Sequence, residues 1–249
     1  MIPDSDLTHD DFLGGKLRLR QPAKGYRAGI DAVFLAASLT AQPGDKVLEL
    51  GAGTGAVMCC LLHRLPDLRL TGVEKNVTYA DIARDNLTAN HLSADVLTAD
   101  FTARLFGENA GFHHVLANPP YFRDGSPSAD DGRHAALHEG TPLPVWIDTA
   151  RKLLRPRGQL TLIHRADRLG TLLAAFGPQF GEIQIRPLAP RHGQPATLVL
   201  IRARRDSKAG TSLLAPIVLH EGTHHTGDRN DYTPTAKAIM WAGQGLNWT

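Results

Sequence analysis

Cysteine is almost absent from this chain of 249 residues, which has two, at adjacent positions 59 and 60. Neighbouring cysteines in an apolar stretch provide neither a disulfide framework nor the spacing of a metal site. We therefore expect Cys59 and Cys60 to fill the core of a helix.

Long apolar runs are missing as well. No stretch approaches the ~18 consecutive apolar residues that a membrane span requires. The first six residues, Met1 to Asp6, contain no basic region followed by an apolar one, so a secretory signal is not expected. Together with the scarcity of cysteine, this predicts a soluble protein of the reducing cytoplasm, without a metal or a membrane partner.

An excess of charge of either sign is also lacking, because 27 Lys and Arg against 25 Asp and Glu leave a net charge of +2. This balance excludes a generally polycationic nucleic-acid wrapper but allows local basic faces. Hydrophobic residues make up 42%, which is enough for a packed core and excludes wholesale disorder. Three basic clusters stand out: Lys16, Arg18, Arg20, Lys24 and Arg27; Arg151, Lys152, Arg155 and Arg157; Arg202, Arg204, Arg205 and Lys208.

From residue 46 onward the pattern alternates between short apolar runs and helical stretches. The expected strands are residues 47–50, 68–74, 96–97, 114–117 and 159–163, and the expected helices end near Pro66 or span residues 79–90 and 145–154. Strands separated by helices of ~10 residues predict βαβ units. The fold class is therefore α/β, with a Rossmann-like, doubly wound and mostly parallel sheet.

The two ends of the chain have a different pattern. Residues 1–15 are acidic and weakly patterned, which predicts a frayed terminus, and residues 16–20 alternate as a strand does before a helix capped by Asp31. Near the other end, residues 183–185 and 197–201 predict an antiparallel edge hairpin, followed by a strand at 217–219 and a short helix at 235–241. We expect an N-terminal extension (1–40), a central domain (41–205) and a C-terminal addition packed on it (206–249).

A glycine-rich turn follows the first predicted strand of the central domain, at Gly51, Gly53 and Gly55. Without Cβ atoms, such a backbone can turn sharply and approach a ligand at the start of a helix. Glu74 ends the next strand, about 20 residues on, where a carboxylate can accept hydrogen bonds from ribose hydroxyls. A tight turn without a ligand is the alternative.

The sequence of this turn also matches the dinucleotide-binding pattern G-x-G-x-x-A, but the charged residues in and beside the turn favour S-adenosylmethionine (SAM). Glu49 precedes the first glycine and would repel a pyrophosphate, whereas it would attract an ammonium group. The turn contains no Lys or Arg to compensate phosphate charge. Farther along, Asp100 could accept the adenine amino group with Phe101 packed nearby, although an ordinary loop aspartate explains Asp100 equally well.

A second motif, Asn118-Pro119-Pro120-Tyr121, follows the fourth predicted strand at the edge where open α/β sheets bind ligands. The prolines fix the turn and remove two backbone donors, so the Asn118 side-chain oxygen and the Pro119 carbonyl can accept both hydrogens of a planar amino group. Two acceptors favour a pyramidal nitrogen as it attacks, which stabilises the transition state without an ionised base. Tyr121 offers a face for a flat substrate. A turn that merely ends the strand is the alternative.

These motifs, with additional segments, resemble a known family. The residues concerned are 49–55, Glu74, 118–121, the segment 27–36, and His138, Glu139 and Trp146. The first three groups are similar to class I SAM-dependent amino-methyltransferases, and the rest resemble the bacterial tRNA (adenine-N6)-methyltransferase family over roughly residues 12–240. The resemblance implies a class I methyltransferase fold, SAM as cofactor, a valine tRNA methylated at the adenine next to the anticodon, and a position for Asp31 near the cofactor's methionine end.

Another pattern, His220-Glu221-Gly222-Thr223-His224, matches the zinc-protease sequence H-E-x-x-H. That chemistry needs a helix, whereas the preceding residues predict a strand and Gly222 a turn. No glutamate follows Glu221 to provide a third ligand. We interpret the match as chance.

The sequence therefore predicts a SAM-dependent methyltransferase acting on an exocyclic nitrogen, with N6 of adenine in tRNA as substrate. Asn118, Pro119, Pro120 and Tyr121 are the expected catalytic residues. The expected cofactor residues are Asp31, Glu49, Gly51, Gly53, Gly55, Glu74, Asp100 and Phe101. The alternatives are a protein glutamine-N5 or DNA adenine-N6 methyltransferase, a non-catalytic RNA-binding module and, least favoured, a nicotinamide oxidoreductase. The basic clusters favour RNA, although each alone is typical of a solvated surface.

Overall fold

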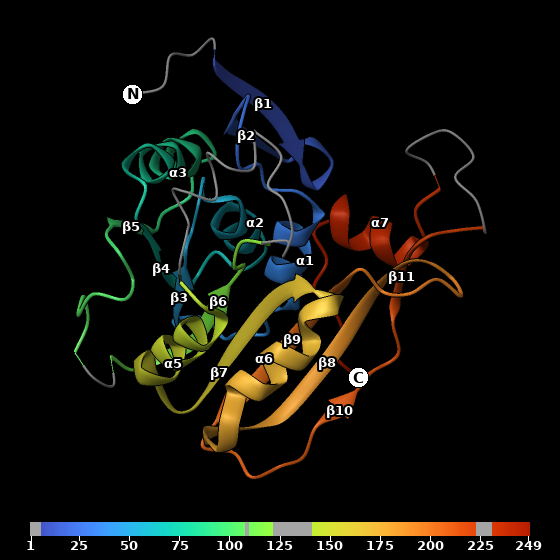
Figure 1. The fold of residues 1–249 in the computed structure, drawn as a ribbon. Coiled ribbons are helices and arrows are strands. Elements are labelled where there is room, and N and C mark those ends of the chain that lie inside the picture. The colour runs from blue at the N-terminus through green and yellow to red at the C-terminus, as the bar shows by residue number, and fades with distance from the viewer. Residues whose placement is uncertain (1–5, 108–109, 122–140, 223–230) are drawn as a thin grey trace.

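The structure is a computed structural model that describes residues 6–107, 110–121, 141–222 and 231–249. Its centre is a nine-stranded sheet with the order β10-β8-β9-β7-β6-β3-β4-β5, and β11 also pairs with β8 (Figure 1). The strands are β3 Lys46–Leu50, β4 Arg69–Glu74, β5 Asp95–Thr98, β6 Phe112–Ala117, β7 Leu154–Arg165, β8 Phe180–Arg191, β9 Leu198–Arg205, β10 Ser212–Leu213 and β11 Ile217–His220.

The pairing confirms the predicted fold class. Strands β3 to β7 pair in parallel, whereas β9 runs antiparallel to both β7 and β8, which gives the edge hairpin. The sheet places the amino ends of β3, β4, β6 and β7 at one edge and their carboxyl ends at the other. Loops that follow these strands therefore meet at the carboxyl edge.

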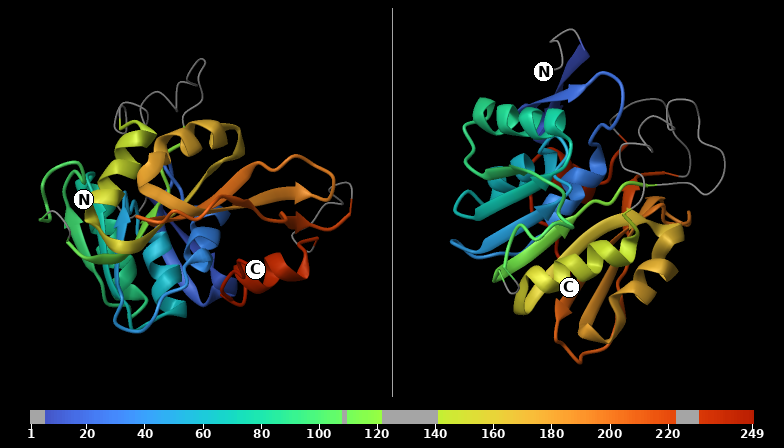
Figure 2. Two further views of the ribbon diagram at one scale, coloured as in Figure 1. Left: turned by 90° about the horizontal axis from the view of Figure 1, so that it is seen from below. Right: turned by 60° about the vertical axis from the view of Figure 1, so that its left-hand side comes forward.

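Six helices lie on the two faces of the sheet within the described residues: α1 Ile30–Ser38, α2 Ala56–Arg64, α3 Val77–Ala89, α5 Leu143–Leu153, α6 Leu169–Phe176 and α7 Pro234–Met240. Consecutive residues of β3 point to opposite faces of the sheet. Val47 packs in the core with α1, α2 and α7, and Leu48 packs in a second core with α5 and α6. Seen from below in Figure 2, α5 and α6 lie on one side of the sheet and α1, α2 and α7 on the other. Across the described residues, every helix is too short or too polar to cross a bilayer.

The prediction of a frayed N-terminus was wrong from residue 7 onward. Strands β1 (Leu7–Phe12) and β2 (Leu17–Pro22) form an antiparallel hairpin joined by a 3-10 turn, Leu13–Gly15. One of its acidic residues is partnered, because Asp10 accepts hydrogen bonds from Gln21 at 2.8 Å and from Arg27 at 2.7 Å. The segment is ordered because residues later in the chain bond to its side chains, and the pattern of residues 1–15 alone does not reveal those bonds.

Two asparagines of α3 attach this hairpin to the domain. Asn86 accepts from the Arg20 amide at 2.7 Å and donates to the Arg20 carbonyl at 3.0 Å, and Asn90 makes the same pair of bonds with Arg18 at 3.0 Å each. The side chains thus satisfy the free edge of β2, which would otherwise expose unpaired backbone groups.

Smaller differences from the sequence predictions concern helices. Helix α1 begins at Ile30 with Gly29 as N-cap, so Asp31 lies in the first turn and is not the capping residue. Helix α6 was not predicted. Cys59 and Cys60 are buried in α2 as expected, and burial raises the pKa of the Cys60 thiol to about 12.

Candidate active site and cofactor pocket

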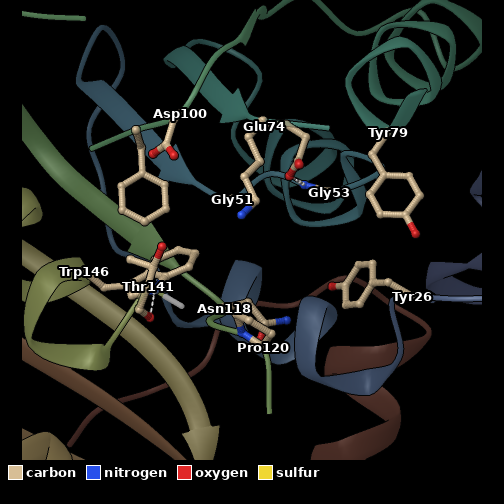
Figure 3. Close-up of a pocket in the computed structure, with 12 residues that line it drawn as sticks. Tyr26, Gly51, Gly53, Glu74, Tyr79, Asp100, Asn118, Pro120, Thr141 and Trp146 are labelled. Carbon is tan, nitrogen blue, oxygen red and sulfur yellow. Dashed lines mark hydrogen bonds between the residues drawn. The ribbon is translucent and has the colours of Figure 1, made fainter. Parts of the chain in front are cut away.

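An open pocket of about 670 Å³, a volume that includes solvent at its mouth, lies at the carboxyl edge of the sheet (Figure 3). Loops after β3, β4, β5 and β6 provide most of its lining, and this edge of an open α/β sheet is where such folds bind ligands. The lining residues are Tyr26, Gly51, Gly53, Glu74, Lys75, Tyr79, Asp100, Phe101, Asn118, Pro120, Thr141 and Trp146. The structure thus brings the two predicted motifs, glycine turn and Asn-Pro-Pro turn, to one cavity.

The glycine turn leaves no space for side chains. Gly51 and Gly53 have φ of +67° and +54°, a region that favours glycine. A Cβ on Gly51 would lie 2.7 Å from the Trp146 ring, and a Cβ on Gly53 would lie 3.0 Å from the Tyr26 ring. Aromatic rings therefore approach the bare backbone of the turn, so a side chain at either position would displace a wall of the pocket. Gly55 has a different environment: its Cβ would meet Ala83 of α3 at 3.0 Å, so this glycine allows close packing of helices.

Glu74 connects the end of β4 to the glycine turn. Its carboxylate is 3% exposed and accepts hydrogen bonds from the backbone amides of Gly53 and Asn76, each at 2.8 Å. Each carboxylate oxygen has a further lone pair. Glu74 is thus held in place with acceptor capacity facing the pocket, as binding of ribose hydroxyls requires.

Glu49 lies behind the turn at the end of β3. It is 1% exposed, and its Oε2 atom is buried without a hydrogen-bond partner among the described residues. Burial, and next the negative charge of Glu74, raise the pKa of Glu49 well above its usual value. An unpartnered buried carboxyl group is costly, and a nearby cation would compensate it.

Asp100 and Phe101 lie at one end of the pocket. Both the backbone amide and the hydroxyl of Thr102 bond to Oδ1 of Asp100, at 2.8 and 2.7 Å, which lowers the pKa of this carboxyl group. The Phe101 and Trp146 rings are 4.3 Å apart between centroids. The Trp146 indole donates to the Thr141 carbonyl at 3.1 Å, which fixes its orientation. Both rings line the pocket, so they offer an aromatic surface to a flat ligand.

Several lining residues were missed from the sequence. Tyr26 and Tyr79 form the opposite end of the pocket, with ring centroids 6.5 Å apart, and Lys75 and Thr141 complete the wall. Lys75 directly follows Glu74, and Tyr26 directly precedes the segment 27–36, so their neighbours in sequence are the available signals. Thr141 has no local signal.

Asn118 faces the glycine turn across the pocket (Figure 3). Its side chain is also hydrogen-bonded to Asp31 of helix α1, which is distant in sequence. Its Nδ2 donates to Oδ2 of Asp31 at 2.9 Å, and the Tyr121 hydroxyl donates to Oδ1 of Asn118 at 2.9 Å. Pro120 lines the pocket and Pro119 is buried. Burial, and next the charge of Asp31, raise the pKa of Tyr121. Its ring meets the edge of His164 at 5.1 Å between centroids.

The three basic clusters do not form one face around this pocket. Arg204 pairs with Gln159 and Phe112 with Leu154, so the second and third clusters lie toward the amino edge of the sheet, opposite the pocket. Many of these charges are matched. The ion pairs are Arg20 with Asp85, Arg27 with Asp10, Arg151 and Lys152 with Asp148, Arg157 and Arg204 with Glu182, and Arg205 with Asp206.

Parts of the remaining motifs lie outside the described residues, including His138, Glu139, Thr223 and His224. His220 ends strand β11, which confirms that the H-E-x-x-H match does not begin on a helix. Its Nδ1 lies 2.7 Å from Asp231, and its ring packs on Tyr232 at 4.2 Å between centroids.

The charges of the residues in and behind the pocket suit SAM. The acids Glu74, Asp100 and, behind the turn, Glu49 outnumber Lys75, the one basic residue in the described lining. A cofactor with an ammonium group, a sulfonium and a ribose suits this balance, whereas a pyrophosphate does not. The bare glycine backbone and the unpartnered Glu49 oxygen agree with that fit.

Comparisons with known proteins lead to the same chemistry. Residues 27–183 match the model of the methyltransferase small domain. A relative from Porphyromonas gingivalis, named tRNA1(Val) (adenine(37)-N6)-methyltransferase, is 32% identical over 66% of this chain and 68% of its own. The crystal structure of a predicted O-methyltransferase from Agrobacterium tumefaciens is 29% identical, with a TM-score of 0.69 over 87% of this chain and 98% of the other.

A 16S rRNA methyltransferase of T. thermophilus, solved with AdoMet and guanosine, is similar in fold, with 20% identity and a TM-score of 0.57 over 80% of this chain and 50% of the other. The family match covers more than half of the chain and includes the glycine turn, Glu74 and Asn118. The chain therefore belongs to the methyltransferase small domain family, and it is a SAM-dependent methyltransferase.

Proposed function

We propose that this enzyme methylates N6 of an adenine in tRNA, and that a valine tRNA, at the adenine next to the anticodon, is its substrate. The observation that carries this proposal is the location of Asn118 and Pro120 in the same pocket as the glycine turn and Glu74. An amide oxygen and a backbone carbonyl in a proline-fixed turn suit a planar amino group. The name of the Porphyromonas gingivalis relative supports the choice of tRNA.

In this proposal the cofactor residues act through shape and charge. Glu74 binds the ribose hydroxyls, Asp100 accepts the adenine amino group beside Phe101, and Glu49 attracts the ammonium group from behind Gly51 and its turn. When bound, SAM supplies a methyl group on a positively charged sulfur, which makes that carbon electrophilic.

The acceptor side of the site works by positioning. The Asn118 oxygen and the Pro119 carbonyl accept the two hydrogens of the adenine amine, which draws its nitrogen lone pair out of conjugation with the ring. Tyr121 stacks on the base. These contacts strengthen as the nitrogen becomes pyramidal and positive, so they stabilise the transition state more than the ground state. The nitrogen–carbon bond would form as the carbon–sulfur bond breaks, which leaves the demethylated cofactor as a neutral thioether, and one of the two amine protons would pass to solvent.

Access to the amine requires the base to be out of a helical stack, as in a loop or by flipping. Because the basic clusters are dispersed, we assign the nucleic acid from the site and the relatives and not from a basic groove. We place the reaction in the cytoplasm, where tRNA is found.

The test is transfer of labelled methyl groups from SAM to separate pools of undermodified tRNA, ribosomal RNA, DNA and protein, with the product identified by mass spectrometry after digestion. N6-methyladenosine in tRNA, lost in Asn118→Ala, is the expected result. Methylglutamine in protein, N6-methyladenine in DNA or a methylated oxygen would refute the substrate and keep the cofactor chemistry. RNA binding without transfer by wild type would refute catalysis.

A further inference from the structure

We infer that Asp31 is a positioning residue that fixes the side-chain amide of Asn118, so that its oxygen and not its NH2 group faces the methyl acceptor. This inference rests on the proposed function, because it assigns a cause to the orientation that the proposed chemistry needs. It gives Asp31 a role different from contact with the methionine end of SAM.

The contacts of Asp31 leave one orientation for its partner. Oδ1 of Asp31 accepts the backbone amide of Gly29 at 3.0 Å, and Oδ2 accepts Nδ2 of Asn118 at 2.9 Å. An ionised carboxylate has no proton to donate. If the amide of Asn118 were reversed, its oxygen would face a carboxylate oxygen at this distance, with electrostatic repulsion in place of a hydrogen bond.

The orientation matters because the two ends of a carboxamide are almost equal in shape and opposite in hydrogen bonding. Only the Oδ1 end of Asn118 can accept a hydrogen from a substrate amine. The Nδ2 end would present its own hydrogens to the amine and occupy the lone pair that must attack the methyl group. A site that binds a substrate amine therefore needs an interaction that prevents the side-chain amide of Asn118 from reversing.

Tyr121 supports the same orientation from the other side. Its hydroxyl has one proton and lies 2.9 Å from Oδ1 of Asn118 and 3.3 Å from Oδ2 of Asp31. The shorter contact gives the proton to Asn118, whose oxygen keeps a second lone pair for the substrate. The triad of Asp31, Asn118 and Tyr121 thus specifies donor and acceptor at each contact.

The bond joins residues that are 87 positions apart. Asp31 lies in the first turn of α1, whose other residues are largely buried, so its carboxylate is held by a rigid element. Asn118 follows the buried strand β6 and precedes two prolines. Two constrained elements therefore meet at this hydrogen bond, as a positioning role requires.

Asp31→Asn tests the inference with little change of shape. The carbonyl of the introduced amide can still accept from Gly29, while its NH2 group faces Asn118 and favours the reversed amide. We expect kcat for tRNA methylation to fall by about 10- to 100-fold, the equivalent of one hydrogen bond to a charged group. The dissociation constant for SAM should stay within about twofold of wild type, measured by calorimetry; about twofold is less than 0.5 kcal/mol.

An exchange of the two side chains gives a second variant, Asp31→Asn/Asn118→Asp. In this double variant the introduced amide donates to one oxygen of the introduced carboxylate, and the other carboxylate oxygen accepts the substrate amine. We therefore expect its kcat to exceed that of either single variant. Asp81→Asn, on the exposed side of α3 and paired with Arg84, is the matched control and should behave as wild type.

A spectroscopic measurement tests the contact without activity. The side-chain amide signal of Asn118, assigned by its loss in Asn118→Ala, should show a hydrogen protected from exchange in wild type and unprotected in Asp31→Ala. An unprotected signal in wild type, unchanged kcat in Asp31→Asn, or a loss confined to SAM binding would each overturn the inference. Absence of adenine methylation by wild type would refute the proposed function, and with it the purpose of the positioning by Asp31, even if the protected signal shows that the contact exists.

Discussion

Glu49→Gln should have opposite effects on stability and on cofactor binding. The wild-type carboxyl group is 1% exposed, and its Oε2 has no partner among the described residues. At neutral pH the folded protein must either bury this charge or take up a proton, and the neutral amide of the variant removes that requirement. The amide in the variant is still buried without a partner among the described residues but carries no charge, so it removes only the additional cost of the charge or of its protonation, on the order of 1–3 kcal/mol. We expect the variant without cofactor to gain up to this amount, and Tm to rise by about 2–4 °C per kcal/mol.

The gain should depend on pH in a defined direction. Burial and the charge of Glu74 raise the pKa of Glu49 in the folded state above its usual 4.5. The stability that comes from the protonated group is fully present below pH 4.5 and is lost as the pH rises through the higher folded value. The difference in Tm between variant and wild type should therefore be small near pH 4.5 and grow toward pH 8.

Binding should change in the opposite sense, because the amide has no charge to attract the ammonium group of SAM. Loss of a charged interaction of about 1.5–3 kcal/mol weakens binding by roughly 10- to 100-fold. Thermal melts from pH 5 to pH 8 and calorimetric titration with SAM measure both effects. A lower Tm without cofactor at pH 8, or unchanged SAM affinity, would refute this account of Glu49.

Two further changes test the pocket. Gly51→Ala should lower the free energy of unfolding by about 1–2 kcal/mol, the cost of left-handed backbone, and should weaken SAM binding because Trp146 must move from a contact of 2.7 Å. Gly170→Ala, in α6 with no neighbouring atom within 4 Å of the new Cβ, is its control in urea unfolding and should be no less stable than wild type. Tyr121→Phe should reduce kcat about 2- to 10-fold, because one hydrogen bond to Asn118 is lost, and should leave KM for tRNA unchanged because the ring remains. An equal KM effect with unchanged kcat would show that the hydroxyl binds RNA and does not orient the amide.

Charge in the N-terminal segment shows one limit of sequence interpretation. The acids of residues 1–15 predict fraying only if they stay in water, and Asp10 is instead bonded to Gln21 and Arg27. The basic clusters show the same limit. Their charges favour an RNA-binding surface in the sequence, but acids on other elements, such as Glu182 and Asp85, form ion pairs with them in the structure. The division into segments 1–40, 41–205 and 206–249 stays a prediction.

The sequence by itself determined the α/β class, the edge hairpin, the glycine turn, Glu74 at the end of the next strand and the Asn118 turn. These features depend on local periodicity, on missing Cβ atoms and on proline, which act over a few residues. Parallel strands then bring successive carboxyl ends to one edge, so motifs far apart in sequence share a site without further information. Only the tertiary structure decided that Tyr26 and Thr141 line the pocket, that Glu49 is buried without a partner, and that Asp31 holds Asn118. Those facts depend on how side chains from separate elements pack, and no local pattern contains that geometry.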